Sequence, residues 1–183
     1  MLTVALAGGT GAATGIAADF INDSRVNTVT SGASGTSAGL SGYRTARNCI
    51  VASVSNAGTG QSYGAVTSNI GRTEAVSVPS GTNDIGIFVG SGQTVIGCTI
   101  ASATTGISAN GARNVIDGNN ITGGSTTGIS AVSGANNANA LIVRNQIRNS
   151  TTKITADTPC QVGPLVNAAG TIASTSPWAN FTD

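Results

Sequence analysis

The sequence predicts an all-β fold, a parallel β-solenoid of about seven coils with 20–26 residues and three short strands in each coil. Two observations predict it. The composition lacks the residues that cover helix surfaces, and two sequence markers recur in step along most of the chain. Each coil of such a fold buries its inner face only by stacking on its neighbours.

The composition excludes a helical bundle and a disordered chain. Among 183 residues there are 26 glycines, one Trp, two Tyr and three Phe, while Glu and Lys occur once each, at Glu74 and Lys153. Soluble helices normally carry many Glu and Lys side chains. Disordered chains lack regularly spaced Val and Ile, which here continue to the C-terminal region.

The first marker is a small residue followed by an aliphatic one. It occurs at Gly15-Ile16, Gly39-Leu40, Gly64-Ala65, Gly86-Ile87, Gly106-Ile107, Gly128-Ile129 and, with Lys in place of Gly, Lys153-Ile154. The aliphatic members follow one another at intervals of 24, 25, 22, 20, 22 and 25 residues. A period this constant predicts one structural unit repeated along the chain.

The second marker is a small polar residue or a cysteine two positions before an aliphatic one. The small members are Ser24, Cys49, Thr73, Cys98, Asn119 and Asn145, and the aliphatic members are Val26, Val51, Ala75, Ile100, Ile121 and Ile147. The second marker keeps step with the first, which favours stacked coils of equal contour.

Within each repeat the apolar runs are short and rich in β-branched residues, as in "TVI", "NVI" and "LIV", which favours strands. Turn residues separate them at 117–119, 123–125 and 133–136. No hydrophilic linker divides the chain, so we interpret 1–183 as one domain. Residues 1–38 are weakly patterned N-terminal coils, 39–152 are regular coils, and 153–183 are a C-terminal coil and cap.

The column of small residues predicts a buried polar ladder. Equivalent side chains of stacked strands lie about 4.8 Å apart, so one Asn amide can donate to the next and accept from the one before. Asn119 and Asn145 fit this role, and Cys49 and Cys98 take the same column as small buried residues. Two coils separate these cysteines by about 9.6 Å, too far for a disulfide. Three cysteines also cannot all pair with one another.

The patterns "TVIGCTI", "NVIDGNNITGG" and "LIVRNQIRNSTT", with the later "VGPLVNAAGTI" and "SPWANF", resemble the right-handed parallel β-helix repeat family, whose superfold pectate lyases share. They are most similar to a group of bacterial, presumed exported proteins whose chains end in a Pro-Trp-Ala-Asn-Phe motif. The resemblance extends from about residue 39 to 183. It implies the right hand of the helix and an extracellular or cell-surface location, but no catalytic residue.

The chemistry-bearing residues do not form a recognisable site. Histidine is absent, which removes His-dependent triads and the commonest metal ligand. No two acids occupy equivalent positions on successive coils, as a calcium-dependent lyase or a glycoside hydrolase of this fold would require. We interpret Asp117-Gly118-Asn119 as a tight corner, because the other ligands of a calcium loop are missing. The sequence therefore predicts no catalytic residue, metal or cofactor.

The aromatic residues invite two interpretations. Trp178 and Phe181 can stack on a sugar, but their place near the end of the chain favours a C-terminal cap over the exposed last coil. Tyr43 and Tyr63 fall in Gly-rich corners and are better candidates for carbohydrate contact, although packing explains them too.

The charge pattern narrows the partners. The net charge is +1 and the arginines are scattered, which disfavours nucleic acid, and no apolar run is long enough to span a membrane. The first twenty residues make a poor signal peptide. We expect a non-enzymatic extracellular solenoid that associates with itself, as an oligomer or filament, or with a surface. The alternative is a carbohydrate-binding or residual polysaccharide lyase-like or hydrolase-like β-helix.

Overall fold

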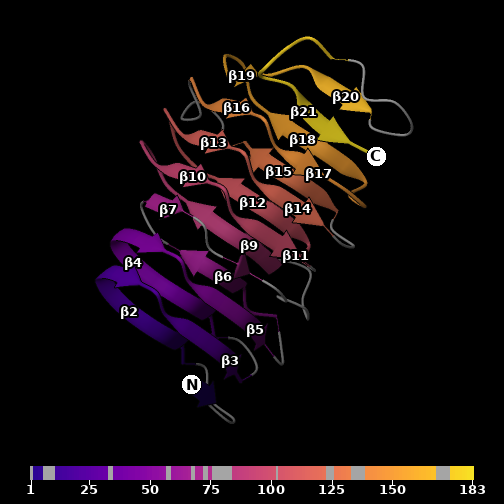
Figure 1. Ribbon diagram of the computed structural model, residues 1–183. Coiled ribbons are helices and arrows are strands. Elements are labelled where there is room, and N and C mark those ends of the chain that lie inside the picture. The colour runs from indigo at the N-terminus through magenta and orange to yellow at the C-terminus, as the bar shows by residue number, and fades with distance from the viewer. Residues whose placement is uncertain are drawn as a thin grey trace.

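The structure is a computed structural model that describes residues 2–5, 11–32, 35–56, 59–66, 69–71, 74–75, 84–101, 103–122, 126–132, 139–167 and 174–183. Throughout these residues the regular elements are strands, and each pairs in parallel with the strands of neighbouring coils. Figure 1 shows the strands stacked along one axis from the N-terminal to the C-terminal end. The predicted all-β parallel solenoid is confirmed.

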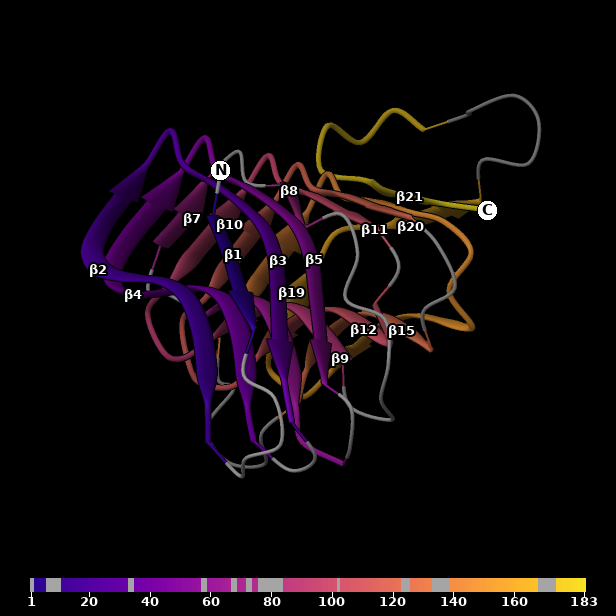
Figure 2. The same cartoon turned by 90° about the horizontal axis from the view of Figure 1, so that it is seen from below.

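Two sheets form the three faces of the stack. The 12-stranded sheet supplies the first and second faces, and the 9-stranded sheet supplies the third. In Figure 2, which looks along the stack from below, strands of successive coils lie one behind another.

The first face contains β18 (Thr152–Ala156), β15 (Thr127–Ala131), β12 (Thr105–Ala109), β9 (Asp84–Val89), β6 (Ser62–Val66) and the first parts of β4 (Ser37–Arg47) and β2 (Ala13–Asn22). The second face contains the last parts of β2 and β4 and then β7 (Asn69–Gly71), β10 (Thr94–Ile96), β13 (Val115–Asp117), β16 (Leu141–Val143) and β19 (Gln161–Val162).

The third face has the order β1 (Leu2–Ala5), β3 (Arg25–Ser31), β5 (Ile50–Asn56), β8 (Glu74–Ala75), β11 (Thr99–Ala101), β14 (Asn120–Thr122), β17 (Gln146–Ile147), β21 (Asn180–Thr182) and β20 (Leu165–Asn167). The last two strands are out of sequence order. After β20 the chain returns, and β21 lies between β17 and β20.

The structure has about five coils of the predicted three-stranded type rather than seven. The difference lies at the N-terminal end, where β2 and β4 run for 10 and 11 residues across the corner between the first and second faces. Later coils break the strand at this corner with a residue of positive φ, such as Gly92, Arg113 or Asn139. Along β2 and β4 no such residue interrupts the strand, so the first two turns of the chain each contain two long strands.

Both sequence markers form columns in the core. Strand pairing aligns the aliphatic residues of the first marker, in the order Ile16, Leu40, Ala65, Ile87, Ile107, Ile129 and Ile154. Pairing on the third face aligns Val26, Val51, Ala75, Ile100, Ile121 and Ile147, and then adds Thr182.

The two columns meet across the core, which explains why glycine recurs in the first marker. A Cβ atom added to Gly106 would lie 2.6 Å from Ile121 Cγ2 and 2.6 Å from the Gly128 carbonyl oxygen. Gly86 and Gly128 face Ile100 and Ile147 in the same way. In the last coil Lys153 replaces the glycine, and there the smaller Thr182 occupies the position of the facing isoleucine. The first marker therefore needs a glycine wherever an isoleucine of the second marker faces it.

Candidate functional site

The asparagines of the second marker form a hydrogen-bonded ladder through the corner between the second and third faces. Asn119 Oδ1 accepts from the backbone N–H of Cys98 at 2.9 Å, and Asn145 Oδ1 accepts from Asn119 Nδ2 at 2.9 Å. Asn180 Oδ1 accepts from Asn145 Nδ2 at 3.0 Å, which extends the ladder by one member. These side chains are fully buried and each Nδ2 also donates to a backbone carbonyl, so the amides satisfy one another away from water.

The chain turns sharply just before five members of the column. Asp23, Asn48, Gly97, Gly118 and Arg144 have φ values of 48° to 64° and immediately precede Ser24, Cys49, Cys98, Asn119 and Asn145. A left-handed residue at this point ends one strand and turns the next side chain into the core.

The other members of the column bond at their own corners, and Cys49 Sγ also lies 3.6 Å from the Ile21 carbonyl oxygen of the preceding coil, to which it can donate. Ser24 Oγ donates to the Asn22 carbonyl, Cys49 Sγ to the Arg47 carbonyl and Cys98 Sγ to the Ile96 carbonyl, in each case two residues earlier. Asn145 Nδ2 makes the same bond to Val143. Thr73 lies outside the described residues. The column therefore stabilises corners, and it is a structural feature rather than a reactive site.

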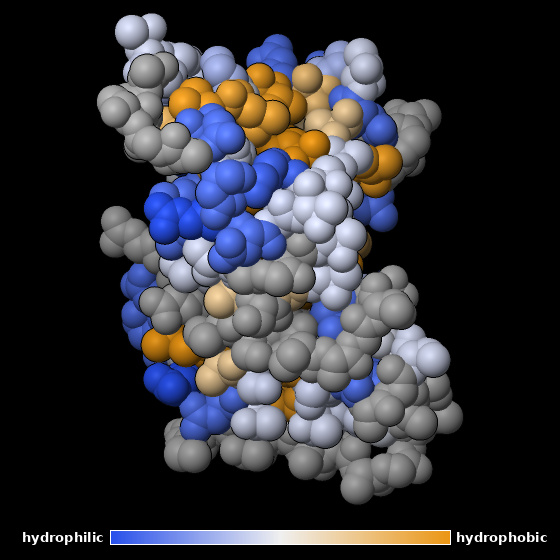
Figure 3. All heavy atoms as spheres, turned by 90° about the vertical axis from the view of Figure 1, so that its right-hand side faces the viewer, coloured by the Kyte–Doolittle hydropathy of each residue, from blue (hydrophilic) through white to orange (hydrophobic). Residues whose placement is uncertain are grey.

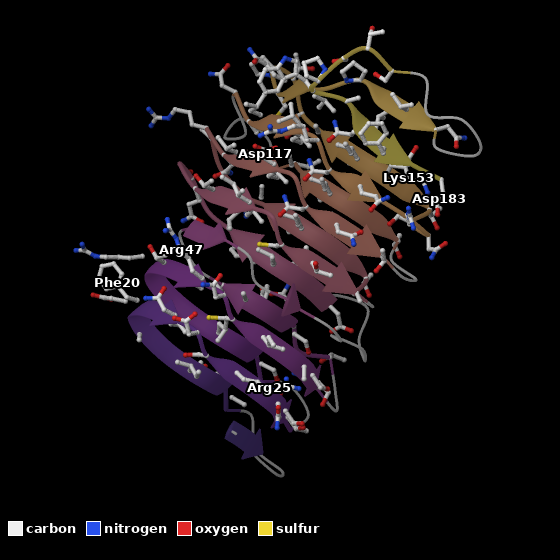
Figure 4. The ribbon with its side chains drawn as sticks, viewed as in Figure 1. Phe20, Arg25, Arg47, Asp117, Lys153 and Asp183 are labelled. Atoms are coloured by element: carbon white, nitrogen blue, oxygen red, sulfur yellow. The ribbon has the colours of Figure 1, made fainter. Side chains whose placement is uncertain are left out.

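The thiols are not set up for chemistry. Cys49, Cys98 and Cys160 are free, and the first two are buried. Burial raises the pKa of the Cys49 thiol, which disfavours the reactive thiolate. Within the described ranges no three of the residue types that commonly bind metals come together. Figure 4 shows that Asp117 and Asp183, two of the acids, lie far apart.

Tyr63 is only partly exposed. Tyr63, on β6, packs its ring edge-on against Phe88 with the centroids 5.6 Å apart, and partial burial raises the pKa of its hydroxyl. Tyr43 lies in β4, and its side chain falls outside the described part of the structure. The predicted sugar contact at Tyr63 therefore gains no support from an exposed ring, and the one at Tyr43 stays a prediction.

Trp178 and Phe181 do not lie across the C-terminal end, where the sequence placed them as a cap. Phe181 lies within β21 and pairs with Gln146 and Val166, so its side chain points outward from the third face while its neighbour Asn180 points inward. Trp178 lies on the outer side of the second face and is 53% exposed. The sequence places both residues at the last coil but does not reveal which side of it they occupy.

Trp178 borders a groove of about 410 Å³ on the last coils. Leu141 and Val143, the outward-facing residues of β16, line the groove with Gln161, Val162, Gly163, Pro164 and Ser176. Val143 is only 3% exposed although it faces outward. The segment that carries Trp178 thus folds back over the outside of the coil and covers it.

An arginine and an aspartate lie beside Trp178. Arg144 Nε donates to Asp117 Oδ1 at 2.7 Å, and the second guanidinium nitrogen donates to Asp117 Oδ2. The guanidinium carbon lies 5.6 Å from the centre of the Trp178 ring. The hydrogen bonds to Asp117 and its negative charge raise the pKa of Arg144, which keeps the guanidinium charged. No sequence signal links these three residues, which belong to three different coils.

Comparison with protein-family models, with curated proteins and with solved structures finds no match for this chain. None of the described elements is a helix long and apolar enough to cross a membrane.

Proposed function

We propose that the protein is a non-enzymatic extracellular β-solenoid that associates with copies of itself through its C-terminal end. The observation that carries the proposal is an uncovered inner column. Val162 aligns with the buried Ile142, yet it is 39% exposed. Leu165 aligns with the buried Asn180 and is 53% exposed.

The inward-facing column of the first face ends in the same way. Ile129 is fully buried, whereas Ile154, its partner in the next coil, is only partly buried. Side chains whose partners in the adjoining strand are buried therefore meet solvent at this end. Figure 3 shows apolar atoms gathered in the C-terminal part of the molecule. Exposed apolar surface that continues a core is typical of an association surface.

The strand edges support the same conclusion. Among the described residues β18, β19 and β20 each pair on one side only, so their other backbone groups are available to a further strand. Proteins usually guard such edges with several charged residues. The three strands contain a single charged side chain, Lys153, and it is paired with Asp183 at 2.9 Å.

The proposal also includes an extracellular or cell-surface location and kinship with the exported bacterial β-helix group. The terminal Pro-Trp-Ala-Asn-Phe stretch at 177–181 supports kinship with the exported bacterial β-helix group, and hence a role at the cell surface or outside the cell. Its contribution of Asn180 to the ladder gives this motif a structural purpose in the fold.

Light scattering after size-exclusion chromatography tests self-association. We expect particles larger than the single chain of 17.8 kDa, with a mass that rises with protein concentration. Leu165→Lys places a charge on the open end and should shift the protein to the single chain. Ile96→Lys is the matched control, because Ile96 is an exposed apolar residue on the outside of β10, away from this end. A wild-type protein that stays a single chain at millimolar concentration would refute the proposal.

A further inference from the structure

We propose that the groove beside Trp178 is a binding site for a neutral pyranose ring of a polysaccharide. The indole is half exposed on the outside of the solenoid, at the edge of a concave surface rather than on a flat strand face. An aromatic ring so placed offers its π-face to the C–H groups of a sugar ring.

The shape and polarity of the groove fit such a ligand. Its volume of about 410 Å³ lies within the range of small-ligand sites, and Leu141 and Val143 give it an apolar floor. Gln161 and Ser176 line the same groove and can exchange hydrogen bonds with hydroxyl groups. A pyranose ring matches this arrangement, because its C–H groups form an apolar face and its hydroxyl groups form a polar rim.

The charges indicate an uncharged sugar. No charged residue is among the described residues that line the groove, and the arginine that contacts Trp178 is already neutralised by Asp117 through two hydrogen bonds. A uronate would find no unpaired cation at this site. The Arg144–Asp117 pair instead fixes the indole in place, so Arg144 is a positioning residue.

This site adjoins the association surface proposed above, because Val162 lines the groove and also belongs to the open end. The floor of the groove faces outward from the second face, whereas Leu165 belongs to the inner column at the open end and does not line the groove. Leu165→Lys should therefore leave sugar binding unchanged, and the two proposals can fail independently.

The chain contains one tryptophan, so its intrinsic fluorescence reports on this groove alone. The full chain is titrated with hexasaccharides of glucose, of xylose and of galacturonate. We expect a saturable change in Trp178 emission with at least one neutral hexasaccharide and none with the galacturonate. Raising the salt from about 0.05 to about 0.5 M should leave the neutral affinity within twofold, because no ion pair forms with the ligand.

Variants followed by calorimetry locate the site. Trp178→Ala should weaken neutral binding about tenfold, and Trp178→Phe should retain part of it because the ring remains. Tyr63→Ala removes an aromatic residue from a different face and should change nothing. Asp117→Asn leaves Arg144 unpaired and should create a salt-sensitive affinity for galacturonate that the wild type lacks. Circular dichroism establishes that each variant is folded.

Four results would overturn the inference. One is the absence of binding to both neutral hexasaccharides, and another is equal affinity in the wild type and Trp178→Ala. The third is a wild-type preference for galacturonate. A change of Trp178 emission with protein concentration, but with no added sugar, would assign the groove to a second copy of the chain and would likewise overturn it.

Discussion

At the scale of single residues, the solenoid depends on buried amides that satisfy one another. Asn145 is fully buried, and its side chain takes part in bonds to both neighbouring coils and within its own. Cys98 and Cys49 fill the same column with a single donor each. The amide members therefore link coils through side chain to side chain bonds, whereas the thiol members bond to backbone carbonyls, that of Cys49 at its own corner and in the preceding coil.

Asn145→Ala should lower the free energy of unfolding by about 3 kcal/mol, because the buried backbone N–H and Nδ2 of Asn119 lose an acceptor and the Ile116 and Val143 carbonyls each lose a donor. Asn120→Ala is the matched control, since Asn120 lies on the outer side of β14 and is only partly buried. Urea denaturation followed by circular dichroism measures both changes. Equal losses in the two variants would show that the ladder contributes no more than an ordinary surface residue.

At the scale of the element, the strand that follows β17 on the third face is β21 rather than β20. Backbone pairing holds β21 between β17 and β20, and Asn180 and Thr182 point into the core. The Asp183 carboxylate, just after the strand, accepts from Lys153 Nζ at 2.9 Å and from the Asn149 backbone N–H at 3.0 Å. These contacts attach the end of β21 to β18 of the first face and to the corner that follows β17 of the third face.

The contacts of Asp183 make the stability of β21 depend on pH. The hydrogen bond from Lys153, and then that from the Asn149 backbone, lower the pKa of the Asp183 carboxyl below its ordinary value of 3.8. Because the folded pKa is the lower one, this stabilisation is complete above the ordinary value and is lost as the pH falls through the folded pKa.

Asp183→Asn should therefore lower the urea midpoint by a constant amount above about pH 5, and the difference from the wild type should disappear in stronger acid. Lys153→Gln, which removes the partner cation, should reduce the same difference. Urea titrations across the acid range measure it. A wild-type and Asp183→Asn difference that persists unchanged at the lowest pH would contradict the assignment.

At the scale of the whole molecule, each coil contacts mainly the coils next to it, so stability should vary along the axis. The middle strands β12 and β15 are covered on both sides, whereas β18 is paired on one side in the described residues. End coils of such a stack are expected to open more often than middle coils.

Native-state hydrogen exchange should show this gradient. The amides of β12 and β15 should exchange most slowly and those of β18 and β19 faster. In Asn145→Ala, exchange should accelerate in β17 and β21 well before it does in β3 and β5. A single rate of opening for all strands, in the wild type and the variant alike, would instead indicate one cooperative unit.

The sequence by itself determined the repeating part of this protein. Equivalent positions of successive coils have the same surroundings, so Gly128 faces Ile147 as Gly106 faces Ile121. The same residue types therefore recur at a regular interval, which can be counted in the sequence. The small polar column could be found for the same reason. The number of three-stranded coils could not, because nothing in a local pattern shows that β2 and β4 continue around a corner.

Only the tertiary structure decided what happens where the repeat ends. Beyond β18 no second copy of the pattern exists for comparison, and the order β17, β21, β20 depends on contacts between residues far apart in the chain. That order turns Asn180 into the ladder and Trp178 outward beside Arg144, 34 residues earlier. A repeated pattern shows which strands pair with one another. Where the chain folds back at its last strands, the pairing depends instead on which free strand edge satisfies the hydrogen bonds of the last buried amide, Asn180.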